Sequence, residues 1–77
     1  MLEKISSADL KQNIDRLCDF LQEGETKKVL QEVTPLLEKF PTSIALYNVK
    51  GLSYSHLKRF DEAIKCYKKA IRLNPDT

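Results

Sequence analysis

The sequence carries an apolar pattern that recurs after 34 positions. Five pairs of apolar or small residues and one pair of prolines have this separation: Leu17 and Gly51, Phe20 and Tyr54, Val29 and Ala63, Val33 and Tyr67, Leu36 and Ala70, Pro41 and Pro75. An internal period of this length is typical of chains built from similar units that stack on one another. The pattern therefore predicts two related units, which together cover residues 10–77.

The first unit is predicted to begin with a helix. Four apolar residues recur at spacings of four, three and four, as on one face of a helix: Leu10, Ile14, Leu17 and Leu21. We expect this helix to start at Ser6, with Asp9 completing a weak capping box, and to end near Glu23. Gly24 follows, and glycine suits the left-handed conformation that ends many helices.

A second helix is expected from Glu25 or Thr26 to Phe40. Its apolar face keeps one phase throughout: Val29, Leu30, Val33, Leu36, Leu37 and Phe40. Pro35 lies inside this pattern and removes one backbone hydrogen bond. Because the apolar phase continues through Pro35, we expect one kinked helix rather than two, ended by Pro41.

The third helix is expected from a cap at Thr42 or Ser43 to about Leu57 or Lys58. Its predicted inward residues are Ile44, Tyr47, Gly51 and Tyr54. A glycine costs about 1 kcal/mol of helix propensity relative to alanine. We therefore expect another backbone to approach the third helix closely at Gly51.

The fourth helix follows a turn at Lys58 and Arg59. Asp61 and Glu62 favour the positive N-terminal end of this helix. Its predicted buried stripe consists of Phe60, Ala63, Ile64, Tyr67, Ala70 and Ile71. Each unit is thus expected to be a helical hairpin.

Seven residues of the second hairpin match a known signature in one register: Tyr47, Gly51, Tyr54, Ala63, Tyr67, Ala70 and Pro75. On these residues the stretch 46–75 resembles the tetratricopeptide repeat, a helix–turn–helix unit with a period of 34 residues. That family usually has Leu before the glycine, and this chain has Lys50. We expect Leu46 or Val49 to turn inward in its place.

The resemblance implies an all-α fold of antiparallel helix–turn–helix repeats within one domain, residues 1–77. The second repeat is expected at about residues 44–77. The first, at about residues 10–43, is a degenerate repeat, since it keeps the phase and helix lengths but has larger residues at the small positions.

Charge and cysteine content exclude several classes of function. Thirteen basic and eleven acidic residues leave a formal charge of +2, which is too weak to indicate a nucleic acid or an anionic membrane as partner. No apolar run is long enough for a signal peptide or a membrane span. Cys18 and Cys66 lack a zinc-binding spacing, so we expect a reduced, cytoplasmic protein with two free thiols.

Few residues could carry catalysis. His56 is the one histidine, and the sequence offers it neither a reactive partner nor further metal ligands. The two glycines, Gly24 and Gly51, do not form a phosphate-binding loop. We expect no catalysis, no cofactor and no metal in this chain, and a protein or peptide as its partner.

In the family, the first helix of each repeat lines a concave groove that holds an extended peptide or a partner helix. Carried over by position, the groove residues are Lys11, Ile14, Cys18, Gln22, Asn48, Leu52, Ser55 and His56. Ile14 and Leu52 would give an apolar floor, and Asn48 could bond a ligand backbone. It stays open whether these residues instead are ordinary exposed residues or are covered by neighbours.

We interpret the chain as a protein-interaction scaffold, with two alternatives left open. Residues 40–76 also resemble bacterial repeat arrays that precede sulfotransferase or glycosyltransferase domains, so the chain could be the N-terminal region of a larger enzyme. A weaker alternative is nucleic-acid contact through the basic residues of the fourth helix: Lys65, Lys68, Lys69 and Arg72.

The sequence stops where a third repeat would start, which would leave an apolar side of the last helix uncovered. Repeat proteins usually need three or more units or a capping helix. We therefore expect either a longer natural protein or pairing with a second copy, and we expect self-association of the isolated chain.

Overall fold

Four α-helices make up the computed structural model, which describes the backbone of residues 7–73 and the side chains of residues 10–73. They are α1 (Ser7–Gln22), α2 (Thr26–Lys39), α3 (Ile44–His56) and α4 (Phe60–Leu73). No strand occurs between residues 7 and 73, so the all-α prediction is confirmed. The predicted capping box of Ser6 and Asp9 depends on side chains outside the described residues.

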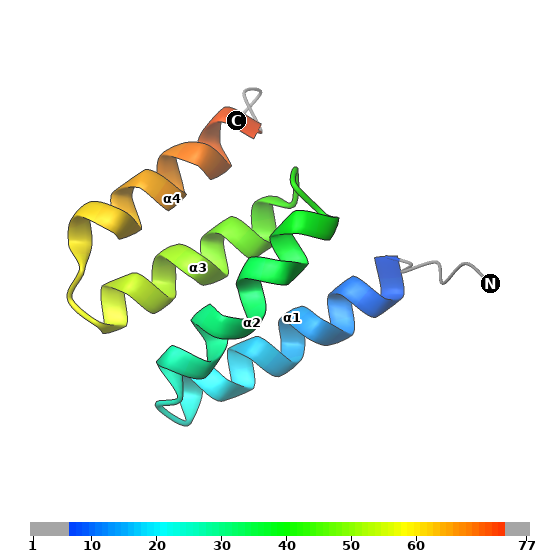
Figure 1. Cartoon of the computed structure of the whole chain (residues 1–77), viewed down its shortest axis with the longest axis horizontal. Coiled ribbons are helices and arrows are strands. Elements are labelled where there is room, and N and C mark those ends of the chain that lie inside the picture. The colour runs from blue at the N-terminus through cyan, green and yellow to red at the C-terminus, as the bar shows by residue number, and fades with distance from the viewer. Residues whose placement is uncertain (1–6, 74–77) are drawn as a thin grey trace.

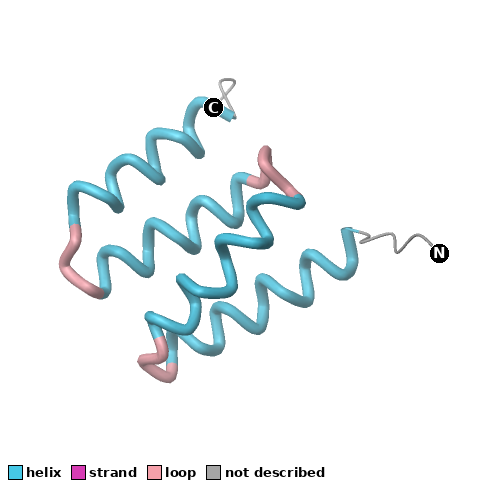
Figure 2. The backbone as a smooth tube through the Cα atoms, in the orientation of Figure 1, coloured by secondary structure: helices cyan, strands magenta, loops and turns pink. Residues whose placement is uncertain are grey.

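Short turns join the helices into two antiparallel hairpins that lie side by side (Figures 1 and 2). α2 packs against α1 and α3, and α1 also contacts α3. Among the described helices, α4 packs against α3 alone. As a result α1 and α4 lie at opposite edges of the array, at the lower right and the upper left of Figure 1.

The ends of the helices follow the same interval as the apolar pattern. α1 ends at Gln22 and α3 ends at His56, which is 34 positions later. α2 and α4 have equal lengths, and both ends of α4 are shifted from those of α2 by that interval. The second hairpin therefore repeats the first in the placement of its turn and of its second helix.

The turns inside the two hairpins share one hydrogen-bond pattern. Four backbone bonds close them: Glu25 N to Phe20 O (2.9 Å), Gly24 N to Leu21 O (3.1 Å), Arg59 N to Tyr54 O (2.9 Å) and Lys58 N to Ser55 O (2.9 Å). This is the Schellman motif, which needs a left-handed residue just after the helix. Gly24 provides it with φ of 83°, as predicted, and Lys58 does so with φ of 62°.

Two other local predictions are confirmed at the ends and in the middle of helices. The Ser43 side chain caps α3 by accepting a hydrogen bond from the Leu46 N–H at 3.2 Å. Pro35 lies within a single helix, α2, rather than between two. Directly before Pro35, the Thr34 hydroxyl donates to the Leu30 carbonyl, one turn earlier in α2, at 3.2 Å.

The core lies between α1, α2 and α3. Its buried apolar residues are Leu17, Leu21, Val29, Val33, Leu37, Leu46 and Val49. Four of them are fully enclosed: Leu17, Val29, Val33 and Leu46. α4 instead buries small side chains, Ala63, Cys66 and Ala70, which is how a helix that packs on one neighbour can approach it closely.

The predicted inward face of α3 is only partly correct. Of that face Gly51 alone is buried, while Ile44, Tyr47 and Tyr54 are half-buried. Leu46, Val49 and Ser53 are buried instead, because α3 lies between α2 and α4 and has to cover both. Leu46 and Val49 thus point into the core in place of Lys50, as expected. The buried Ser53 hydroxyl donates to the Val49 carbonyl at 2.9 Å.

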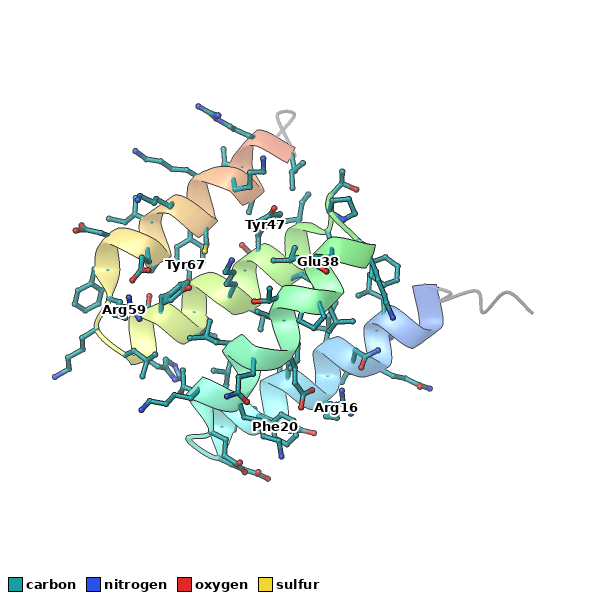
Figure 3. All side chains as sticks on the ribbon, viewed as in Figure 1. Arg16, Phe20, Glu38, Tyr47, Arg59 and Tyr67 are labelled. Carbon is teal, nitrogen blue, oxygen red and sulfur yellow. The ribbon has the colours of Figure 1, made fainter. Side chains whose placement is uncertain are left out.

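The close approach predicted at Gly51 is present, but its nearest neighbour is a side chain. The ring of Tyr67 from α4 occupies the space beside the Gly51 Cα (Figure 3). The expectation of a neighbouring backbone is wrong in that respect. A tyrosine at the small-residue interface of α4 needs a position without a side chain on the facing helix.

The predicted buried stripe of α4 is wrong at three residues. Ala63 and Ala70 are buried, but Phe60, Ile64 and Ile71 are exposed. The spacing places these three on one side of the helix, and in the described part of the chain α4 has no second helix to cover that side. Cys66, predicted as a packing residue, is buried.

Candidate partner-binding surface

The structure places the eight predicted groove residues on two neighbouring helices. Lys11, Ile14, Cys18 and Gln22 follow one another on α1 at spacings of three, four and four, and Asn48, Leu52 and Ser55 do so on α3 at four and three. Residues with these spacings share one face of a helix. Since α1 contacts α3, the two rows belong to the first helices of adjoining hairpins.

The two rows differ in how far their side chains are exposed. Lys11 and Gln22 are exposed on α1, whereas Ile14 and Cys18 are half-buried and pack against the core. On α3 Leu52 is a large apolar residue with 42% of its surface exposed, and its neighbours in the row, Asn48 and Ser55, are polar. The exposed large apolar side chain of the two rows therefore lies on α3, at Leu52, and the expected floor is not shared equally by both helices.

His56 lies one helical turn after Leu52, at the last residue of α3. It lines an open depression of about 590 Å³ together with Leu57 and the turn and first residues of α2, Gly24 to Lys28. The hollow connects the two hairpins at the end where both Schellman turns lie. Two other depressions are lined by residues outside the predicted set, one by Asn13, Arg16, Gln31, Glu32, Pro35, Leu36 and Lys39, and one by residues 58–62.

A cation covers the aromatic ring at the end of the first helix in each hairpin. The Lys28 Nζ lies 4.5 Å from the centre of the Phe20 ring, and the Arg59 guanidinium lies 5.6 Å from that of Tyr54. Phe20 and Tyr54 are equivalent under the 34-residue shift (Phe20 and Arg59 are labelled in Figure 3). These contacts stabilise the turns and place positive charge around the depression at this end.

An ion pair links α1 to α2 in the first hairpin. Arg16 donates to Glu32 at 2.8 Å and to the Asn13 side chain at 3.0 Å (Arg16 is labelled in Figure 3). No local pattern indicates this pair, because its members are sixteen residues apart and belong to different helices. The equivalent residues of the second hairpin are Lys50 and Cys66, so the cation is kept there and the carboxylate is not.

The thiol of Cys66 is held in its neutral form. Burial raises the pKa of Cys66 above its ordinary value of 9.0, while the positive charge of Lys50 lowers it in part and the negative charge of Glu62 adds to the rise. A nucleophilic cysteine requires the opposite shift. Cys66 therefore acts as a packing residue between α4 and α3.

No group of three His, Cys, Asp or Glu side chains is placed to hold a metal ion within the described residues. None of the helices α1–α4 is long and apolar enough to cross a membrane. What the surface presents is an apolar side chain on α3, polar neighbours and a shallow basic-rimmed hollow.

Two helical hairpins with equivalent turns, stacked edge to edge, define an all-helical repeat protein. The family model described as tetratricopeptide repeat matches residues 44–77. The second hairpin is therefore a tetratricopeptide repeat. The boundaries of the match coincide with the interval from the start of α3 to the end of the chain.

One curated relative is similar to nearly the whole chain. The chain is 31% identical over 70 residues, 90% of its length, to a protein of Dictyostelium discoideum named DnaJ homolog subfamily C member 3 homolog. It spans only 14% of the length of that relative. No solved structure matches the chain significantly.

Proposed function

We propose that this chain is a non-catalytic scaffold that binds an extended peptide or a partner helix along α1 and α3. Tetratricopeptide repeats generally mediate contacts between proteins, and the family match supports that general role here. The proposed contact residues are Lys11, Ile14, Cys18, Gln22, Asn48, Leu52, Ser55 and His56. The observation that carries the proposal is Leu52, a 42% exposed apolar residue flanked on its helix face by Asn48 and Ser55.

Binding on this surface would combine shape, apolar contact and hydrogen bonding. The apolar side chain of Leu52 loses water on contact with a partner, which supplies most of the free energy in such grooves. Asn48 and Ser55 lie one turn of helix away on either side and can bond the backbone of an extended peptide. The polar groups would then set the register of the ligand while Leu52 sets its affinity.

We also propose that residues 10–43 are a degenerate first repeat that supports the second. The shared Schellman turns and the equal lengths of α2 and α4 support this reading. The two free cysteines, Cys18 and Cys66, are compatible with the reducing cytoplasm, which we propose as its location. Self-association through α4 is a further property that we propose for the isolated chain.

The alternative of a repeat region attached to a sulfotransferase or glycosyltransferase draws no support from the comparisons. The relative is named as a DnaJ homologue, and the match covers a small part of it. Sequencing the gene beyond Thr77 separates the two possibilities directly. A transferase domain in the continuous reading frame would favour the alternative.

The scaffold proposal is tested with a peptide library displayed on phage and the 77-residue chain as bait. The best enriched peptide is synthesised, and its affinity is measured by fluorescence anisotropy. We expect Leu52→Asp to weaken binding at least tenfold while the helical circular dichroism signal is kept. Ile64→Asp, which changes an exposed apolar residue on α4 in the same way, is the matched control and should leave peptide affinity unchanged.

Two results would contradict the scaffold proposal. One is a peptide that binds equally well to the Leu52→Asp variant and to the original chain. The other is a library that yields no peptide whose binding depends on any of the eight proposed residues. Loss of helicity in Leu52→Asp would instead show that Leu52 belongs to the core.

A further inference from the structure

The outer side of α4 carries an exposed apolar stripe. Phe60, Ile64 and Ile71 are 57%, 50% and 65% exposed, and Tyr67 is half-buried between them. Their spacings of four, three and four place all of them on one face of the helix. Three large exposed apolar side chains in a row on one helix mark an interaction surface rather than the scattered exposure that soluble proteins tolerate.

The first hairpin shows what this face does when it has a neighbour. The residues that lie 34 positions before Phe60, Ile64 and Ile71 are Thr26, Leu30 and Leu37. Thr26 and Leu37 are buried, and Leu30 packs against the core. In that hairpin α3 packs against α2, whereas α4 is at the edge of the array (Figure 1). The α4 stripe is thus a face of the kind that this fold covers with a helix.

Charges along one edge of the stripe are divided between its two ends. Asp61 lies at the N-terminal end of α4, and Lys68 and Arg72 lie toward its C-terminal end, all three exposed. At about 100° per residue these three side chains project from the same side of the apolar row, while Lys65, exposed at the middle of α4, projects from that side too but farther from the row. Asp61 forms no ion pair within the described residues, since the carboxylate that Arg59 binds is that of Glu62.

We propose that a second copy of this chain packs on the stripe, with the two α4 helices antiparallel across a two-fold axis near Lys65 and Cys66. Phe60 then lies opposite Ile71 of the second copy, and Ile64 lies opposite Tyr67 of the second copy. This gives a geometry to the self-association proposed above, and it does not involve the α1–α3 surface. The four apolar residues of each copy become mutually covered.

The division of charge selects the antiparallel arrangement. In this register Asp61 is displaced along the axis by two residues, about 3 Å, from Lys68 and from Arg72 of the second copy. Symmetry repeats the same pairing at the other end. A parallel pair would instead bring the two acidic ends to one level and the two basic ends to another, and would leave Asp61 of each copy without a basic residue of the other copy beside it.

Head-to-tail stacking of α4 on α1 fits the residues less well. Between residues 10 and 22, the exposed residues of α1 are polar or charged: Lys11, Gln12, Asp15, Arg16, Asp19 and Gln22. Stacking on them would set the α4 stripe against charged groups. The two-fold arrangement buries apolar surface from both partners and closes at two copies, while head-to-tail contacts would extend into open chains.

The proposal is tested by sedimentation equilibrium of the 77-residue chain over a range of concentrations, with a reducing agent to keep Cys18 and Cys66 as thiols. A contact made by one helix from each copy is small for a specific interface, so we expect a dimer that dissociates on dilution. Ile64→Asp should raise the dissociation constant at least tenfold. Leu52→Asp, on α3, should leave it unchanged, and circular dichroism checks that both variants stay folded.

A charge cycle tests the register. Asp61→Lys and Arg72→Asp should each weaken the dimer, because each sets like charges opposite one another. The double variant should recover much of the original affinity, since the pair is restored with reversed signs. Lys69→Asp makes a matched charge change on the opposite side of α4, and it should have a much smaller effect than Arg72→Asp.

Each of the following results would overturn the proposal. One is a chain that stays monomeric at all concentrations, in which case a different partner covers the stripe. Others are a dimer that persists in Ile64→Asp and a mass that keeps rising beyond that of two copies. Another is a double charge variant whose loss of binding free energy equals the sum of the losses in the two single variants. A monomer that still binds a selected peptide through Leu52 would overturn the dimer and leave the scaffold proposal standing.

Discussion

The ring of Tyr67 lies against the Cα of Gly51, so that a β-carbon on residue 51 would be 2.9 Å from Cε1 and 3.0 Å from Cζ of that ring. Contacts this short do not occur between real carbon atoms, and therefore any side chain at position 51 has to displace Tyr67. The pair joins the two helices of the second hairpin, α3 and α4. It explains why the chain carries a glycine in the middle of a helix.

Gly51→Leu should destabilise the fold by wedging α3 and α4 apart. Overpacking of this kind costs about 1–3 kcal/mol, which for a chain of this length is roughly 4–8 °C in melting temperature for each kcal/mol. Thermal unfolding followed by circular dichroism measures the change. Gly51→Leu with Tyr67→Ala should recover part of the loss, because the ring that clashes is gone. Equal melting temperatures for Gly51→Leu and the original chain would show that α4 does not pack as described.

Lys58→Gly should stabilise the chain. Lys58 has φ of 62°, a left-handed conformation that costs a residue with a β-carbon about 1 kcal/mol and costs glycine little. Urea unfolding should therefore give an increase of roughly 0.5–1 kcal/mol in the free energy of unfolding. The equivalent residue of the first hairpin is the control, since Gly24→Ala meets open space but has φ of 83° and should destabilise by a similar amount.

Core packing should contribute more to the free energy of unfolding than the ion pair between α1 and α2. Leu17 is fully buried, and Leu17→Ala should cost about 2–5 kcal/mol. The Arg16 and Glu32 side chains are 55% and 29% exposed, so Glu32→Gln should cost less than about 1 kcal/mol, and less still in high salt. Urea unfolding of both variants compares the two effects. A larger loss from Glu32→Gln than from Leu17→Ala would reverse this ranking.

The Cys66 thiol should make stability depend on alkaline pH. Because burial raises its pKa in the folded chain above 9.0, the unfolded chain loses this proton first as the pH rises. The contribution of Cys66 is therefore fully present below about pH 9 and is lost as the pH rises through the raised pKa of the folded state. Unfolding in urea at pH 8, 9 and 10 should show that decline, and Cys66→Ala should reduce it.

Labelling with iodoacetamide gives a second view of the same thiol. At pH 8 the folded chain should label at Cys66 much more slowly than the chain in urea, since a buried neutral thiol reacts poorly. Mass spectrometry of the peptides separates Cys66 from Cys18. Rapid labelling of Cys66 in the folded chain would contradict its buried, protonated state.

Local signals in the sequence were sufficient for the helices and their ends. Ser43, Gly24 and Pro41 each act within a few residues of their own position, and the apolar pattern predicted the four helices that the structure contains. Lys58 could not be predicted as left-handed, because its conformation comes from the hydrogen bonds of the turn and not from its residue type. The Arg16–Glu32 pair depends on how α1 and α2 pack, which no local pattern specifies.

The burial of α4 was the main failure of sequence reasoning, and its reason is physical. Periodicity shows that Phe60, Ile64 and Ile71 share a side of the helix, but it does not show whether a neighbour covers that side. For the candidate site, the family resemblance supplied the eight residues, and their spacing places them in rows on α1 and α3. It did not indicate that Ile14 would be drawn into the core and leave Leu52 as the main apolar contact.

Because α4 packs against α3 alone among the described helices, α4 should be the helix that detaches first. Ala63, Cys66 and Ala70 can be released without opening the enclosed residues Leu17, Val29, Val33 and Leu46. Amide protons of α4 should accordingly exchange with solvent sooner than those in the middle of α1 and α2. A partner that covers the outer side of α4 would therefore also stabilise the helix that opens first.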